Sequence, residues 1–399
     1  MIERIKALAE DSAATLAEWR HDFHAHPELS FEEFETTARI KARLEEIGFT
    51  GMRVGTAGKP TGLVVDLNPG KPGPCFALRA DIDALPMKEV GNPSYRSTKE
   101  GVMHACGHDS HITMVLGAAK VLKALESELP GRVRFIFQPS EESPHRSGAK
   151  AMIEEGVLEG VDAISGLHVW GTIPAGVIGY HAGPFMAAAD EWECTIFGKG
   201  GHGGVPHLAA DPIVAAGALI GALQTIVSRE SDPLETVVVT CGHMEAGTTF
   251  NIIPDRAFLQ GTVRTFNPEV RAEMPARMER ICNGISQALG CRAEFRFKNV
   301  LPATINDKAF TEEAAEVARK VLGVENVKDI PPSMGAEDMS YYLQKVPGTF
   351  MFFGTHNEAK GIVQPQHHPE YDVDDDILPK GSALLATLAW DFLEKNSKG

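Results

Sequence analysis

The stretch His104-Ala-Cys-Gly-His-Asp-Ser-His111 places one thiol, three imidazoles and one carboxylate within eight residues. Cys106 and His108 are two residues apart, so in an extended or loop segment both side chains could point to the same side. A thiolate and an imidazole together suit zinc and other late first-row divalent metals. Residues 112–125 have apolar side chains at helical spacing, which puts the cluster at the start of a helix. A lone Cys-x-His pair is more often a structural cysteine beside histidines, so a metal site needs further ligands.

Length and composition bound the class of protein. A chain of 399 residues predicts two or more domains, and 43% hydrophobic with 23% charged residues is typical of soluble globular proteins. The formal net charge of -16 argues against nucleic acid as a partner. The first 30 residues lack the apolar core of a signal peptide, and we expect no membrane-spanning segment. Six widely spaced cysteines predict free thiols in a reducing compartment, so we expect a cytoplasmic protein.

Helix and strand patterns alternate along the first half of the chain. Helices are predicted at 32–47 and 147–155, and buried strands at 62–67, 75–81, 132–138 and 163–169. The first two strands are interpreted as a pair around the turn 69–74, which is rich in Pro and Gly. Such alternation predicts an α/β sheet.

The pattern changes near Phe185. Strand, helix, strand, strand, helix and strand signals follow in that order at 191–198, 211–228, 236–240, 257–264, 269–289 and 292–297. This order predicts an α+β sandwich of ferredoxin-like kind. A helix at 307–321 and a strand at 348–354 then resume the earlier pattern. We therefore predict a three-layer α/β/α catalytic domain formed by residues 1–186 and 301–399, interrupted by a ferredoxin-like domain at 187–300.

The segment Gln138-Pro-Ser-Glu-Glu-Ser143 follows a strongly apolar strand. Adjacent carboxylates usually face solvent, but sheet proteins place functional groups at strand ends. One carboxylate of the pair Glu141 and Glu142 could bind a metal while the other acts as a general base.

Two further histidine positions extend the set of possible ligands. His168 ends the strand at 163–169, where a histidine is more often a satisfied core residue, and His367 lies in a loop beside His368, where both could be surface residues. Together with the thiol, His108 and one glutamate, these residues form a mixed sulfur, nitrogen and oxygen set. Such a set could hold one or two divalent ions.

Asp81 and Asp83 follow the strand at 76–80, and strand alternation places both on one face. Either could hydrogen-bond a ligand histidine and fix its tautomer. A salt bridge with Arg79 explains Asp81 equally well.

Five segments, in this order, resemble the motifs of the metal-dependent amidohydrolase family that contains hippurate hydrolase, with plant indoleacetyl-amino-acid hydrolases, aminoacylases and carboxypeptidases among its relatives. They are Arg79–Pro86, His104–His111, Gln138–Glu142, Gly166–Val169 and His367–Asp372. The similarity runs nearly from end to end and includes His21–Ser30.

The resemblance implies a site for two divalent metal ions, with zinc favoured and manganese, cobalt or nickel as alternatives. Its implied ligands are Cys106, His108, Glu142, His168 and His367. It further implies that Glu141 is the general base and that Asp83 supports the ligands. Broader relatives have a histidine ligand where this chain has Asp81 and an aspartate where the cysteine motif lies, which leaves occupancy of the second metal site open.

The interrupting domain resembles the family's lid and dimerisation domain through Gly200–His207, Asn251–Pro254 and Gly261–Arg264. This resemblance implies that His202 and Asn251 steady the tetrahedral oxyanion, in their own or a partner subunit's site. It also implies that Arg264 binds the substrate carboxylate. Without the resemblance, His202 is explained by a flexible glycine loop and Arg264 by a structural ion pair.

The predicted function is metal-dependent hydrolysis of the amide bond of N-acyl amino acids, of the hippurate or N-acetyl kind. The alternative is a dipeptidase or carboxypeptidase that uses the same metal and water chemistry. A homodimer or higher homo-oligomer is implied by the resemblance, and no nucleic-acid or membrane partner is expected. A catalytically silent binding protein would be expected to lack the base or a ligand, and both are present.

Overall fold

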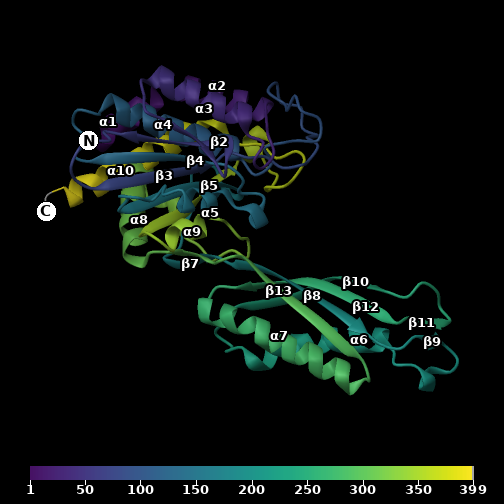
Figure 1. Cartoon of the computed structure of the whole chain (residues 1–399). Coiled ribbons are helices and arrows are strands. Elements are labelled where there is room, and N and C mark those ends of the chain that lie inside the picture. The colour runs from purple at the N-terminus through teal and green to yellow at the C-terminus, as the bar shows by residue number, and fades with distance from the viewer. Residues whose placement is uncertain (398–399) are drawn as a thin grey trace. The chain divides into compact units, whose positions relative to one another are not determined.

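The computed structural model describes residues 1–397, and the chain divides into two compact units (Figure 1). The larger unit comprises Met1–Gly183, Ile305–Pro331 and Asp338–Gly399. The smaller unit comprises Pro184–Thr304 and Pro332–Glu337.

An eight-stranded sheet forms the centre of the larger unit, in the order β1-β2-β4-β3-β5-β16-β6-β15. The strands are β1 (Arg53–Thr56), β2 (Lys59–Leu67), β3 (Cys75–Asp81), β4 (Arg132–Gln138), β5 (Ala163–Pro174), β6 (Ile178–Tyr180), β15 (Val327–Asp329) and β16 (Gly348–His356). Three neighbouring pairs in this order are parallel, namely β4 with β3, β3 with β5, and β5 with β16. β4 lies between β2 and β3, so the predicted pairing of 62–67 with 75–81 is wrong. Every residue of β3 is buried, as suits a central strand with neighbours on both edges and helices on its faces.

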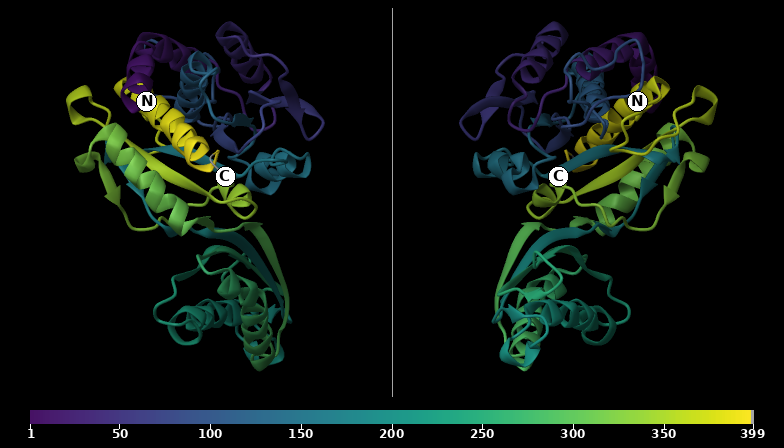
Figure 2. Two further views of the ribbon diagram at one scale, coloured as in Figure 1. Left: turned by 90° about the vertical axis from the view of Figure 1, so that its left-hand side faces the viewer. Right: turned by 90° about the vertical axis from the view of Figure 1, so that its right-hand side faces the viewer.

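Helices cover both faces of this sheet and confirm the three-layer α/β/α architecture (Figure 1). One layer contains α3 (Phe34–Ile47), α4 (His108–Ala124), α8 (Lys308–Leu322) and α10 (Leu378–Asn396), with α1 (Ile2–Glu10) and α2 (Ala13–Ala25) packed against it. Figure 2 shows α10, in yellow, running over the sheet. The other layer contains the short helices α5 (Gly148–Glu154) and α9 (Met339–Leu343), which contact each other.

The smaller unit has the predicted ferredoxin-like order of elements. Its elements are β8 (Ala188–Phe197), α6 (Pro212–Thr225), β10 (Val237–Ala246), β12 (Arg256–Thr265), α7 (Pro268–Ala288) and β13 (Arg292–Leu301). The four strands form an antiparallel sheet in the order β10-β12-β8-β13, on which α6 and α7 pack. Burial alternates along β8, as the sequence predicted for a strand with one face against a core.

Helix α6 continues into a π-helical turn at Ile226–Glu230. The combined segment Pro212–Glu230 is long and apolar enough to cross a membrane by length and composition, a property that we did not expect of any stretch from the sequence. A single helix of this kind is weak evidence for a membrane span, because core helices of soluble proteins have the same length and apolar composition. One side of α6, including Leu219 and Leu223, packs in the core of the smaller unit.

A buried network of charges holds α2 against the first turn of α4. Arg20 Nε donates to Asp109 Oδ2 at 3.0 Å, and His24 Nδ1 lies 2.8 Å from the same oxygen. Arg20 also pairs with Asp372 and Asp375 in the segment before α10. Burial opposes ionisation of Asp109, but the Arg20 and His24 charges outweigh it and hold its pKa far below the ordinary value. The network therefore joins three segments distant in sequence through paired buried charges.

We expect the stability of the protein to fall with rising pH through His24. Burial lowers the pKa of His24, but hydrogen bonds to Asp109 and Glu89 outweigh burial and raise it to about 9. A raised pKa in the folded state contributes stability below the unfolded value near 6.5 and loses it as pH passes 9. Urea unfolding should show that the free energy of unfolding of wild type falls by about 3 kcal/mol between pH about 6.5 and pH about 9. This fall should come in addition to any change measured for a His24→Gln variant over the same range.

The matched control is His207→Gln, which changes an exposed histidine. This variant should keep the wild-type pH dependence. Parallel pH profiles for wild type and His24→Gln would show that His24 does not carry the effect.

Candidate metal centre

The candidate site lies where neighbouring parallel strands end. Strands β4, β3 and β5 are adjacent and parallel, so their carboxyl ends meet at one edge of the sheet. Asp83 follows β3, the pair Glu141 and Glu142 follows β4, and His168 lies in β5. This edge is where open α/β sheets bind their ligands.

The loop before α4 and the loop after β16 complete this edge. His108 is the first residue of α4, and Cys106 precedes it by two residues. The backbone N–H of His367 donates to the carbonyl of Ala105 at 2.8 Å, which brings the loop that contains His367 to Cys106. Segments separated by more than 200 residues therefore converge.

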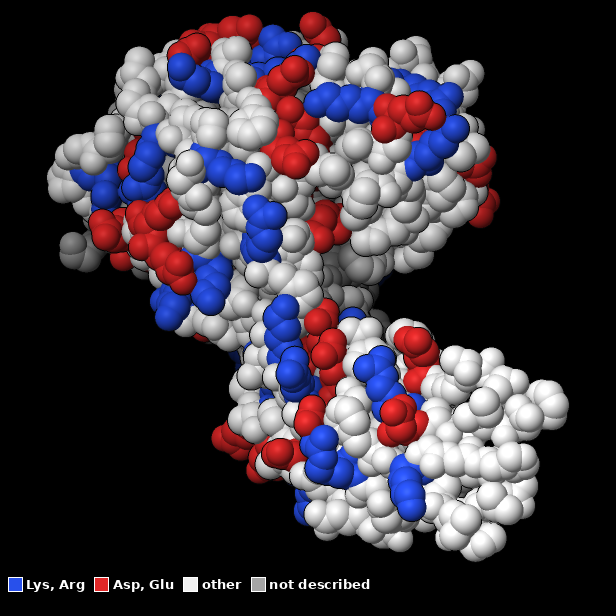
Figure 3. Space-filling view, turned by 45° about the vertical axis from the view of Figure 1, so that its right-hand side comes forward, with Lys and Arg blue, Asp and Glu red and all other residues white. Residues whose placement is uncertain are grey.

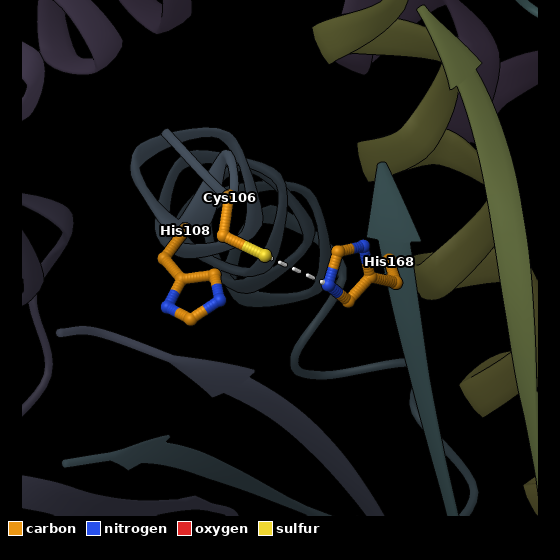
Figure 4. Close-up of side chains that lie close together, drawn as sticks. All are labelled: Cys106, His108 and His168. Atoms are coloured by element: carbon orange, nitrogen blue, oxygen red, sulfur yellow. Dashed lines mark hydrogen bonds between the residues drawn. The ribbon is translucent and has the colours of Figure 1, made fainter. Parts of the chain in front are cut away.

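All five residues proposed as ligands occur in three overlapping groups of side chains that lie close enough together to hold a metal ion. The groups are Cys106 with His108 and His168; Cys106 with Glu142 and His367; and His108 with Glu141 and Glu142. Within each group the potential ligand atoms lie within 4.8 Å of one another. Figure 4 shows the Cys106 sulfur directed at His168 Nε2, 3.4 Å away, with the His108 ring beside it. Any two of these groups share one residue, so two neighbouring ions could share a ligand.

Hydrogen bonds set the tautomers of the two buried histidines. Nδ1 of His108 lies 2.8 Å from the carbonyl of Asp83, and Nδ1 of His168 lies 2.6 Å from the carbonyl of Val169. Because a carbonyl can only accept, each Nδ1 must carry the hydrogen. Nε2 of both rings is then the nitrogen that faces the cluster, as in metal-binding histidines whose other nitrogen is held by the protein.

The donors fit a divalent cation. Nε2 of His108 and Oε1 of Glu142 are buried and have no hydrogen-bond partner within residues 1–397, and they lie 3.8 Å apart. Buried polar atoms are normally paired, so two such atoms facing each other indicate a place for a cation. Burial and the carboxylates of Glu142 and Glu141 raise the pKa of Cys106 well above its ordinary value. A cation beside the sulfur would reverse this effect and favour the thiolate.

His108 makes binding of a cation dependent on pH. Burial lowers the pKa of His108, but Asp81 and Asp83 outweigh it and raise the pKa to about 10. A cation at Nε2 must therefore displace a proton at neutral pH.

Among the five proposed ligands, His367 is the most accessible, with 54% of its side chain exposed.

A glycine permits the close approach of the cysteine loop to β5. Gly107 has φ +87, and a Cβ on it would lie 2.3 Å from Cγ2 of Val169. Any other residue would both strain the backbone and push the loop from the strand. Cys106 and His108 are therefore positioned by the glycine between them.

Asp83 and Asp81 occupy different positions behind the cluster. Asp83 accepts the backbone N–H of Glu141 at 3.1 Å and that of Glu142 at 3.0 Å. Asp81 contacts Arg79 Nη1 at 2.7 Å and His111 Nδ1 at 2.6 Å. The predicted salt bridge of Asp81 with Arg79 is therefore present, whereas the histidine that Asp81 hydrogen-bonds is His111, which is not one of the proposed ligands.

His111 lies beside the cluster with both ring nitrogens engaged. Its Nε2 accepts the backbone N–H of Val169 at 2.8 Å, so its Nδ1 carries a hydrogen and donates to Asp81. No lone pair remains for a metal. His111 instead connects Asp81 to the strand that contains His168.

The three residues predicted from the lid resemblance lie in the smaller unit. His202 is in the short strand β9 (Gly201–His202), which pairs with β11 (Ile252–Ile253), and its Nδ1 accepts the N–H of Gly204 at 2.9 Å. Asn251 directly precedes β11, and its carbonyl accepts the N–H of Gly203 at 2.8 Å. Arg264, on β12, donates to the Thr262 hydroxyl and, at 3.2 Å, to the Val263 carbonyl. Their roles stay predictions.

The sequence did not identify two buried carboxylates around the site. Asp109 carried no assigned role, and Glu33 was not considered, although it accepts the N–H of Ser140 at 2.9 Å. The only signal for Glu33 is its place three residues after the segment His21–Ser30, which resembles the family. Glu33 is the N-cap residue of α3, and acidic residues are common at helix N-termini, so residue type alone does not single it out.

Comparison with known proteins places the chain in a family. Residues 77–391 match the model of "Peptidase family M20/M25/M40". N-acetylcysteine deacetylase of Bacillus subtilis is 43% identical over 95% of this chain and 97% of its own length. Thermostable carboxypeptidase 2 of Saccharolobus solfataricus is 38% identical over 99% of this chain and 100% of its own.

A solved structure agrees with these matches. A dinuclear metal binding peptidase of the M20 family from Bacillus subtilis is 39% identical, with a TM-score of 0.84 over 96% of this chain and 99% of that one. The match covers both units of the fold, and the sequence resemblance to metal-dependent amidohydrolases is confirmed. The chain belongs to the peptidase family M20/M25/M40.

Proposed function

We propose that this protein hydrolyses the amide bond of N-acyl amino acids and releases a carboxylic acid and an amino acid. The observation that carries the proposal is a buried thiol, imidazole and carboxylate cluster with a second carboxylate, Glu141, beside it. Family membership supports a metal-dependent amidohydrolase or peptidase that acts on small molecules. The similarity to an N-acetylcysteine deacetylase favours an acyl amino acid, and the similarity to a carboxypeptidase supports the peptidase alternative.

The five residues that would hold two divalent ions are Cys106, His108, Glu142, His168 and His367. Such ions supply Lewis acidity, which lowers the pKa of a water molecule and polarises the scissile carbonyl. Thiolate and imidazole ligands favour zinc, and manganese, cobalt and nickel are the alternatives.

Glu141 is positioned to move protons. It is 8% exposed, and one of its oxygens lies within 4.8 Å of ligand atoms of His108 and Glu142. Its backbone N–H is fixed by Asp83. Glu141 would take a proton from the attacking water and deliver it to the nitrogen of the leaving amino acid.

The smaller unit would act as a lid and dimerisation domain. His202 and Asn251 would stabilise the oxyanion, and Arg264 would bind the substrate carboxylate. A homodimer is supported by the exposed apolar side chains of α6, where Ile213 is 40% and Val214 is 56% exposed, and by the edge strand β10. Figure 3 shows a stretch of the smaller unit without charged side chains. The six free cysteines are consistent with the proposed cytoplasmic location.

A substrate panel tests the function. Hippurate, N-acetyl amino acids and dipeptides should be assayed with added zinc or manganese, and the acyl amino acids should show kcat/KM at least about tenfold above the dipeptides. Faster cleavage of dipeptides would establish the peptidase alternative. No hydrolysis of any member would contradict both.

We expect Glu141→Gln to reduce kcat on the order of 100- to 10,000-fold, because proton transfer to and from the reacting groups is lost. Its metal content, measured by elemental analysis, should stay near that of wild type. The matched comparison is Glu142→Gln, which changes the adjacent glutamate. Because Glu142 is a proposed ligand, this variant should lose bound metal as well as turnover. Substantial activity in Glu141→Gln would refute the assignment of the base.

We expect Cys106→Ala to lower the metal content of the purified protein, because the sulfur belongs to two of the three ligand groups. Cys75→Ala is the control, since Cys75 is equally buried but lies in β3, outside these groups. Elemental analysis should show full metal content for Cys75→Ala only. If Cys106→Ala also kept full content, the sulfur would not be a ligand.

A further inference from the structure

Three consecutive backbone N–H groups after β4 each donate to a buried carboxylate. Those of Glu141 and Glu142 donate to Asp83, and that of Ser140 donates to Oε1 of Glu33 at 2.9 Å. Glu33 is 107 residues away in sequence and is completely buried. The segment that carries both catalytic-site carboxylates is therefore held along its backbone by two carboxyl groups from other parts of the chain.

Ser140 has φ +56, a left-handed conformation that residues other than glycine rarely adopt. Its carbonyl accepts the N–H of Gly148 at 3.0 Å, and its hydroxyl donates to the carbonyl of Arg146 at 2.9 Å. The bond to Glu33 completes this set. Since such conformations persist only where surrounding contacts impose them, the direction in which the chain leaves β4 depends on these bonds.

The segment that contains Glu33 also contacts Asp83. Ser30 donates its hydroxyl to Asp83 Oδ2 at 2.6 Å, and Oε1 of Glu33 accepts the N–H of Phe31 at 2.9 Å. Phe31 has φ +59, so this turn is held in an uncommon conformation as well. The turn at 30–33 thus contacts the segment after β4 twice, through Asp83 and through Glu33.

Only one oxygen of Glu33 is used as an acceptor in these bonds. Oε2 is buried without a hydrogen-bond partner in the part of the chain that the structure describes. Burial, and then the charge of Asp83, raises the pKa of Glu33 to about 8. A neutral carboxyl group accepts through its carbonyl oxygen, which is what the carboxamide of glutamine also provides.

We propose that Glu33 is a positioning residue for the reaction, which holds Ser140 in its left-handed conformation so that Glu141 and Glu142 are directed into the metal cluster. The proposal rests on the proposed function, because Glu141 is its general base. Glu33 acts through the backbone and does not touch the reacting groups. None of the roles proposed above for residues of the site belongs to Glu33.

The experiment compares Glu33→Leu, which removes the acceptor, with Glu33→Gln, which keeps it. At saturating zinc, Glu33→Leu should lower kcat about 10- to 100-fold with KM changed less than about threefold, since misplaced catalytic groups cost rate more than affinity. Hydrogen–deuterium exchange of residues 138–148 should become faster. Glu33→Gln should stay within about threefold of wild type in kcat and show wild-type exchange.

The matched control is Glu28→Leu. Glu28 is 7% exposed, belongs to the same part of the chain, and accepts the N–H of Thr36 at 2.8 Å and its hydroxyl at 2.9 Å. Its loss should lower stability but leave kcat and the exchange of residues 138–148 as in wild type. A general loss of stability is thereby separated from loss of positioning.

Wild-type kcat and exchange in Glu33→Leu would overturn the proposal, and so would equal impairment in Glu33→Gln. If Glu33→Leu does not fold, Glu33→Asp replaces it; this variant shortens the reach by one methylene, and wild-type kcat and exchange in it would also overturn the proposal. If wild type cleaves no member of the substrate panel, the proposed function fails. The exchange measurement still decides whether Glu33 positions the segment.

Discussion

Asp83, through its carboxylate and its backbone carbonyl, joins the ends of two strands to the start of a helix. It accepts the backbone N–H groups of Glu141 and Glu142, while the carbonyl of the same residue accepts Nδ1–H of His108. Burial opposes its ionisation, but His108, the Ser30 hydroxyl and the Glu141 N–H outweigh burial and lower its pKa. A buried carboxylate is tolerated only when it is paired in this way. Asp83 alone therefore fixes the proposed base Glu141 and two of the proposed ligands, His108 and Glu142.

Buried charges of both signs lie in and around the proposed ligand cluster. Arg79 is buried and pairs with Asp81 and with Asp338 at 2.7 Å each. Asp338 lies with Glu141 in one group of possible ligand atoms, and Glu142 lies with Cys106 in another. Concentrating acidic groups in a low-dielectric interior is unfavourable unless an opposite charge accompanies them. Arg79 supplies such a charge for Asp81 and Asp338, and a divalent ion held by the proposed ligands would supply one for Glu141 and Glu142.

Local patterns account for what the sequence predicted. Strands such as β4 and the alternating β8 were found because periodicity is a property of neighbouring residues, and the cluster was found because Cys106 and His108 are two residues apart. The position of β4 between β2 and β3 was missed because strand pairing depends on residues distant in sequence. A short Pro- and Gly-rich turn suggested a hairpin, whereas β3 pairs in parallel with β4 and β5, which come later in the chain.

The geometry of the site depends on backbone conformations that residue type does not reveal. Ser140 and His367 have φ near +60, where serine and histidine are uncommon, and Gly107 has φ +87. Each lies within two residues of a proposed ligand or is one. Hydrogen bonds to distant segments hold two of them, because Glu33 accepts the N–H of Ser140 and the Ala105 carbonyl accepts that of His367. Local preference and tertiary structure disagree at these positions, as they commonly do at functional sites. The identity of the ligands can therefore be inferred from their chemistry, but their arrangement follows only from the folded chain.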